Sequence, residues 1–137
     1  MSQIDLSALI TATQKQESNR LSARDALAQL RWQHETAGLI LADGQHIATT
    51  RESQSQIANA AMGVQAGLIT DPMPWKTLQG WTEFSPVSLL DMATQVSAHV
   101  RACFAAERAI SAQLEISEDP AALDLQAAFA QALAAGS

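Results

Sequence analysis

Residues 85–115, SPVSLLDMATQVSAHVRACFAAERAISAQLE, decide the fold, because they predict one long amphipathic helix. Ser85 followed by Pro86 is typical of a helix start, with serine at the N-cap and proline in the first turn. Apolar side chains then recur at spacings of three and four, as one helix face requires: Leu89, Met92, Ala93, Val96, Val100, Cys103, Phe104, Ile110 and Leu114. We expect the rest of a small domain to pack against this face.

Two β-hairpins are predicted before the long helix. Residues 39–49 place Asp43-Gly44 between two apolar runs, a pattern that favours a type I′ turn because this turn needs positive φ. Residues 75–84 carry large apolar side chains on both sides of Gln79-Gly80. The predicted fold class is therefore α+β, with two short β-hairpins forming a small antiparallel sheet, or two, packed on the long α-helix.

Additional N- and C-terminal helices are predicted around this centre. Residues 4–36 are helical in pattern, but the polar stretch 11–20 either continues the helix or interrupts it before a fresh start at Ser22. Asp119-Pro120 predicts the start of a last helix that ends near residue 134.

A shorter helix is predicted over residues 54–66. Thr49-x-x-Glu52 reads as a capping box, with Thr49 at the N-cap, and explains Glu52. Arg51 has no such local explanation. We expect it to pair with Glu107 or Asp91, and partner or anion binding is the alternative.

The composition argues against several classes of protein. The chain has 137 residues, 47% hydrophobic and 16% charged, which fits one folded domain and excludes global disorder. Its net charge of −6, with eight Lys and Arg spread along the chain, makes nucleic-acid binding unexpected. A single cysteine fits a reducing compartment. Neither a secretory signal nor a membrane span is expected.

Both terminal helices carry apolar side chains with few charges around them, which favours docking or homo-oligomerisation. The three tryptophans, Trp32, Trp75 and Trp81, are expected mainly in the core, with Trp81 the best candidate for exposure because it lies beside a turn. The predicted partner-binding residues are Leu6, Leu9, Ile10, Trp81, Leu125, Phe129 and Leu133.

Four blocks of sequence resemble a domain family of tailed-phage and prophage tail-fibre and tail-associated proteins. The blocks are Arg31-Trp32, then Thr49 to Gln54, then Trp75-Lys76 with Gly80-Trp81, and last the HVRACFAAE segment from His99. The resemblance covers roughly residues 30–115 and implies an extension (1–30), a family domain (31–116) and a docking helix (117–137). It implies these motif residues: Trp32, Thr49, Arg51, Glu52, Trp75, Gly80, His99, Phe104 and Glu107.

The resemblance implies a non-enzymatic tail protein that binds other proteins, as a tail-fibre assembly chaperone or a component of the fibre or tail tip. It implies a partner among the tail-fibre or other tail proteins, no cofactor, and a location in the bacterial host cytoplasm during assembly or in the virion tail.

Two other hypotheses stay open from the residues. His99, Cys103 and Glu107 recur every fourth position and are metal-ligand types, so a small metal- or anion-dependent enzyme that also uses Arg51 is one alternative. Cys103 lies in the apolar stripe, however, which favours helix packing and no metal. A prophage-encoded regulator of the host is the other alternative, supported only by the acidic charge.

Overall fold

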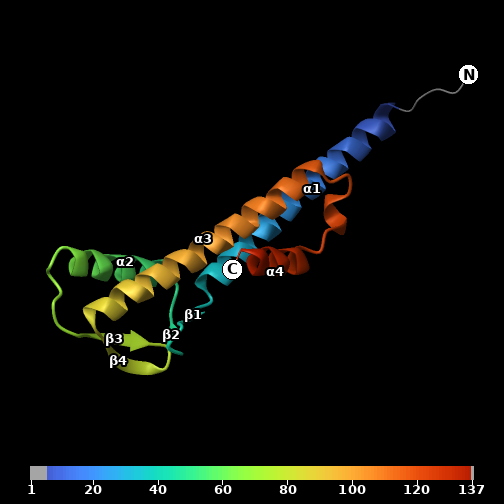
Figure 1. The fold of residues 1–137 in the computed structure, drawn as a ribbon. Coiled ribbons are helices and arrows are strands. Elements are labelled where there is room, and N and C mark those ends of the chain that lie inside the picture. Colours follow the sequence, from blue (N-terminus) through green and yellow to red (C-terminus); the bar gives the residue numbers. More distant parts are fainter. Residues whose placement is uncertain (1–5, 137) are drawn as a thin grey trace, which may run out of the picture. The chain divides into compact units, whose positions relative to one another are not determined.

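The computed structural model describes the backbone of residues 6–136 and the side chains of residues 11–136. Along the chain the elements are α1 (Leu6–Thr36), β1 (Leu39–Ile40), β2 (His46–Ile47), α2 (Arg51–Gln65), β3 (Met73–Thr77), β4 (Gly80–Phe84), α3 (Pro86–Ile116), the 3-10 turn η1 (Pro120–Ala122) and α4 (Leu125–Ala135) (Figure 1). The predicted α+β class is confirmed. The strands form two separate two-stranded antiparallel sheets, β1–β2 and β3–β4, rather than one.

The contacts divide the chain into two compact units. The first combines the residues up to Arg31 with those from Phe104 onward, and the second is Trp32–Cys103. Both long helices contribute residues to each unit, and described residues of both predicted terminal segments fall in the first. The division of the sequence into 1–30, 31–116 and 117–137 stays a prediction. None of the helices in the described part of the chain combines the length and the apolar character of a membrane span.

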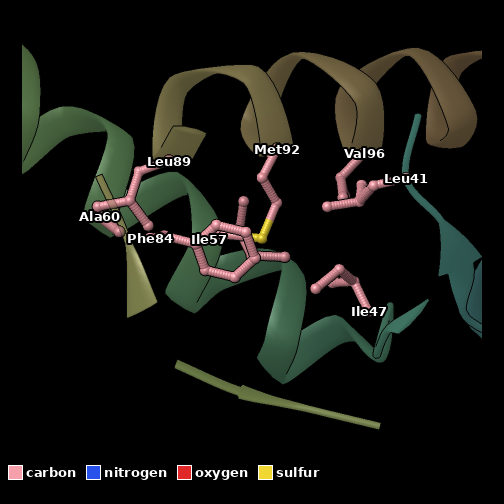
Figure 2. Packing of buried hydrophobic residues seen from close by; sticks show 8 residues of the cluster. All are labelled: Leu41, Ile47, Ile57, Ala60, Phe84, Leu89, Met92 and Val96. Atoms are coloured by element: carbon pink, nitrogen blue, oxygen red, sulfur yellow. The ribbon is translucent and has the colours of Figure 1, made fainter. Parts of the chain in front are cut away.

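The core of the second unit joins α2, α3 and both hairpins. Figure 2 shows the Phe84 ring from β4 beside Ile57 of α2 and Met92 of α3. The remaining buried members come from the same elements and from the β1–β2 hairpin: Leu41, Ile47, Ala60, Leu89 and Val96. The α3 residues of this cluster belong to the apolar stripe that the sequence predicts.

The turn between β1 and β2 differs from the predicted type I′ turn. Gly44 has a φ of +90°, but Asp43 does not have a positive φ, and a type I′ turn needs both. The strands pair only at Leu39–Ile47 and Ile40–His46, so five residues connect them. Asp43 Oδ1 accepts the N–H of Gln45 at 3.0 Å, an Asx-type bond that lets the aspartate stay at negative φ.

The second hairpin forms where the sequence predicts it, but its turn lies one residue earlier than the predicted Gln79-Gly80. Thr77 pairs with Gly80, which leaves Leu78 and Gln79 as the turn. Gly80 has a φ of +119°. The N–H of Leu78 donates to the carbonyl oxygen of His46 at 2.8 Å, so one backbone hydrogen bond connects the two hairpins.

The first unit has its own core and its own helix capping. Its buried apolar side chains come from α1, α3, η1 and α4: Ala23, Leu27, Leu30, Ala106, Ile110, Leu114, Pro120 and Phe129. Arg20 of α1 donates to the carbonyl oxygens of Leu114 at 2.9 Å and Ser117 at 3.0 Å, satisfying acceptors at the end of α3. Arg24 forms an ion pair with Glu115.

Two helix boundaries resolve or correct the predictions. The helix α1 is continuous through the polar stretch 11–20, so Ser22 does not begin a new helix. The last helix begins at Leu125 rather than at the predicted start Asp119-Pro120, because Asp124 accepts the N–H of Ala127 as its N-cap. Asp119 makes no such capping bond, and Pro120 begins only one turn of 3-10 helix.

Candidate functional site

A buried carboxylate lies at the C-terminal end of α1, in the second unit. Glu35 is 1% exposed, and Arg51 of α2 binds it with two groups, Nε at 2.6 Å and Nη2 at 3.0 Å. Gln54 Nε2 donates to the same carboxylate at 2.9 Å and to the carbonyl oxygen of Thr49 at 3.0 Å. We call Glu35, Thr49, Arg51 and Gln54 the Glu35 cluster. Its bidentate pairing and the added amide compensate the charge that is buried.

The backbone at the end of α1 is satisfied by side chains from elsewhere in the unit. Thr49 Oγ1 donates to the carbonyl oxygen of Glu35 at 2.7 Å and accepts the N–H of Gly38 at 2.9 Å. His99 Nε2 lies 3.0 Å from the carbonyl oxygen of His34 and therefore donates, since a carbonyl oxygen only accepts. These bonds replace the partners that a helix lacks at its C-terminus.

The Glu35 cluster corrects two predictions. Arg51 pairs within the chain, as expected, but with Glu35 instead of Glu107 or Asp91. The N-cap of α2 is Thr50, whose hydroxyl accepts the N–H of Ser53 at 3.1 Å, and not Thr49, whose hydroxyl is used at the end of α1. Glu52 lies in the first turn of α2, exposed to solvent. Sequence reasoning missed Glu35, and its only signal is an acidic residue one turn after Arg31-Trp32.

A second polar cluster belongs to the first unit. Arg31 Nε lies 2.8 Å from Glu107 Oε1, and its guanidinium lies 4.5 Å from the centre of the Phe104 ring. The predicted motif residues Phe104 and Glu107 thus hold Arg31 by a cation–π contact and an ion pair. Both clusters connect helices through charged side chains.

The three candidate metal ligands on α3 have separate surroundings. His99 bonds the end of α1, Cys103 is fully buried in the apolar stripe, and Glu107 pairs with Arg31. In the part of the chain that the structure describes, no three His, Cys, Asp or Glu side chains gather closely enough to hold a metal ion.

A groove with a volume of about 520 Å³ lies in the second unit between α2 and the β3–β4 hairpin. We call it the hairpin groove. The α2 wall presents Gln56, Asn59 and Ala60. The other lining residues are largely apolar and come from the loop after α2 and from the hairpin: Ile69, Met73, Pro74, Trp75, Lys76 and Trp81.

The hairpin groove is formed by the Trp75-Lys76 and Gly80-Trp81 block of the sequence. Trp75 is half-buried and packs edge-to-face on Phe84, with ring centres 6.4 Å apart. Trp81 lies directly opposite Lys76 in the register of the hairpin and is 73% exposed. The expectation that Trp81 is the best candidate for exposure among the three tryptophans is confirmed, and its role in partner binding stays a prediction.

The other predicted binding residues have mixed positions. Phe129 is fully buried in the first unit, so it is a core side chain and not the exposed anchor that the sequence predicts, while Leu125 and Leu133 are half-buried. Trp32, expected in the core, is 50% exposed. The side chains of Leu6, Leu9 and Ile10 lie outside the described part of the structure, and their role stays a prediction.

Comparison with known proteins assigns the family. The model of the domain of unknown function DUF4376 matches residues 18–134. The chain belongs to this DUF4376 family. The matched region includes both polar clusters and the whole hairpin groove, and it extends beyond residues 30–115 at both ends.

No curated protein and no solved structure matches the DUF4376 chain significantly. The groove, the exposed Trp81 and the two polar clusters are therefore the observations from which its function is inferred.

Proposed function

We propose that this DUF4376 protein is a non-enzymatic component of a bacteriophage or prophage tail that works by binding another tail protein. It acts either as a chaperone of tail-fibre assembly or as a structural component beside the fibre or tail tip. The tail assignment rests on the resemblance of the four sequence blocks. The binding activity rests on the hairpin groove.

The exposure of Trp81 is the observation that carries this proposal. A tryptophan that is 73% exposed beside an apolar groove leaves a large hydrophobic area in water. Tryptophan is enriched among the side chains that dominate binding energy at protein interfaces, where truncation costs about 2 kcal/mol or more. A partner that covers Trp81 and fills the groove would gain the free energy of removing this hydrophobic area from water.

The chemistry of the hairpin groove favours binding over catalysis. Its polar lining consists of two amides and one ammonium group, from Gln56, Asn59 and Lys76. Acid–base or nucleophilic catalysis needs a base within hydrogen-bond reach of a second reactive group. Three side chains elsewhere that have such chemistry, Glu35, His99 and Glu107, are engaged in helix capping and ion pairs.

The proposal places this protein in the cytoplasm of the bacterial host while the tail is assembled. If its role is structural, the protein stays in the virion tail. Homo-oligomerisation through the half-buried Leu125 and Leu133 and the N-terminal residues Leu6, Leu9 and Ile10 remains part of it. Phe129 is not part of this surface, because it is already covered.

Co-expression with the tail-fibre gene product encoded beside this chain tests the proposal. We expect a complex that survives size-exclusion chromatography with light scattering. Trp81→Ala should weaken the complex about 30-fold, the equivalent of 2 kcal/mol. Ile116→Ala is the matched control, since Ile116 is also exposed but belongs to the first unit and does not line the groove. Absence of a complex with the unmodified chain, or equal loss in both variants, would overturn the proposal.

A further inference from the structure

The hairpin groove runs along the edge of β3. Four consecutive residues of this strand, Met73 to Lys76, line it, whereas Trp81 is its only lining residue from β4. Consecutive side chains of a strand point to opposite faces, so a surface that includes all four follows the strand's edge rather than one face. Among the described strands β3 pairs only with β4, so no strand of this chain occupies its other edge.

Pro74 limits how an extended chain can bind there. Proline has no N–H to donate, and its presence in an edge strand discourages the addition of another strand. A bound segment must therefore gain most of its affinity from side-chain contacts with Trp81, Trp75 and the α2 wall. Such contacts are specific for the residues of the segment, unlike a run of backbone hydrogen bonds.

Lys76 gives the groove a charge opposite to that of the molecule. Among the described residues that line the groove it is the one that carries a charge, in a chain with a net charge of −6. Among the residues with described side chains it has no ion-pair partner. An ammonium without a described ion-pair partner, beside an exposed indole, complements a carboxylate that is adjacent to an apolar side chain.

We propose that the hairpin groove binds an extended protein segment that places an aromatic or aliphatic side chain against Trp81 and an aspartate or glutamate carboxylate on Lys76. This inference rests on the proposed function, because it specifies the partner of the same site. The apolar contact supplies most of the affinity. The carboxylate fixes the register and direction of the segment, since one lysine opposite one tryptophan defines a single spacing.

Phosphate-bearing polymers fit this groove less well. Their affinity depends on several cations that together displace counterions, and the groove offers one. Aromatic stacking alone would not compensate for the repulsion from a chain with 14 acidic residues.

The test is a selection of random twelve-residue peptides displayed on yeast against the full chain. Enriched peptides should carry Asp or Glu within about three residues of an aromatic or aliphatic residue, the reach of two adjacent side chains on a strand. Synthetic copies should lose at least tenfold affinity for Lys76→Glu and for Trp81→Ala. A peptide with its acid changed to Lys should regain binding to Lys76→Glu but not to the unmodified chain.

Several outcomes would overturn this inference. The selection would enrich no peptides, or it would enrich peptides that are basic or uncharged. Alternatively, the selected peptides would bind the unmodified chain and the Lys76→Glu variant equally well. Self-association that Lys76→Glu abolishes would identify a second copy of the chain as the occupant instead. A tail-fibre complex that depends on Trp81 but not on Lys76 would preserve the proposed function and reject the carboxylate contact, so the two failures are distinguishable.

Discussion

Glu35 and Arg51 form an ion pair in which the glutamate side chain is almost completely buried and the arginine side chain is 59% exposed. The pair connects the last turn of α1 to the first turn of α2, across the β1–β2 hairpin in the sequence. The arginine thus remains hydrated on one side while it supplies two donors to a carboxylate that water does not reach.

Replacement of Arg51 by Ala should destabilise the second unit by about 1–3 kcal/mol, because it removes the charged donors and leaves Gln54 as the remaining donor among the described contacts of the carboxylate. Arg51→Lys should recover part of the loss, since it keeps the charge but not the two-donor geometry. Chemical denaturation followed by circular dichroism measures both. An Arg51→Ala protein within about 0.5 kcal/mol of the original would contradict the role of the pair.

Thr49→Val should destabilise the same unit by about 1–3 kcal/mol, although the two side chains have nearly the same shape. The valine would bury the carbonyl oxygen of Glu35 and the N–H of Gly38 without the hydroxyl that serves both. Thr49→Ser keeps that hydroxyl and is the matched control. Equal stabilities of the Val and Ser variants in urea would show that the hydrogen bonds are dispensable.

Phe129→Ala should cost about 3–5 kcal/mol, because the ring is fully buried in the first unit. Phe129→Asp should unfold this unit rather than merely dissociate an oligomer. Ala130→Asp is the control, since Ala130 is exposed on the same helix. Thermal unfolding and light scattering together distinguish the cases. A folded Phe129→Asp monomer would mean that the ring is covered by another chain.

Gly67→Ala should cost about 1 kcal/mol, because Gly67 follows α2 with a φ of +76° and nothing lies within 4 Å of the added methyl group. The cost is thus backbone strain and not a clash. The N–H of Leu68 bonds the carbonyl oxygen of Gly63 at 2.8 Å, as in a Schellman cap. Gly67→Asn should be milder, since asparagine tolerates this conformation. If Gly67→Ala and Gly67→Asn lower the free energy of unfolding equally in equilibrium denaturation, backbone strain at Gly67 is not the explanation.

Trp81→Ala should change stability by no more than about 0.5 kcal/mol, whereas Trp75→Ala should cost clearly more because Trp75 packs on Phe84. Acrylamide should quench the fluorescence of Trp81 strongly in the free chain and weakly when the hairpin groove is occupied. If Trp81→Ala unfolds the protein, the residue is part of the core and the groove is not a binding site.

Local rules explain how much of the fold the sequence predicts. The start of α3 follows from Ser85 and Pro86, and its apolar face from three- and four-residue spacing. The place of the second hairpin, to within one residue of its turn, follows from Gly80. Each of these signals acts within a few residues. The predictions were wrong at the start of α4 and for the type of the β1–β2 turn. In such places two candidate cap or turn residues lie close together in the sequence, as Asp119 and Asp124 do, and local rules do not choose between them.

The candidate site was predictable only in part. The exposure of Trp81 followed from its place beside a turn, because a turn residue at the end of a hairpin has few neighbours. The partners of Arg51, Thr49 and His99 did not follow, since each contacts a residue of α1 that is distant in the sequence. The i, i+4, i+8 spacing of His99, Cys103 and Glu107 allowed one shared site, but His99 bonds the carbonyl oxygen of His34, Cys103 is buried, and Glu107 pairs with Arg31.

By itself the sequence determined the helices, the two hairpins, the acidic charge and the block that carries Trp75, Lys76, Gly80 and Trp81, because periodicity, caps and glycine conformations act locally. Only the tertiary structure decided that Glu35 is buried beneath Arg51, that Phe129 is a core residue, and that Trp81 and Lys76 flank a groove with α2. The burial of a side chain depends on which helix and hairpin faces pack together. One sequence pattern is compatible with many ways of packing the same apolar faces.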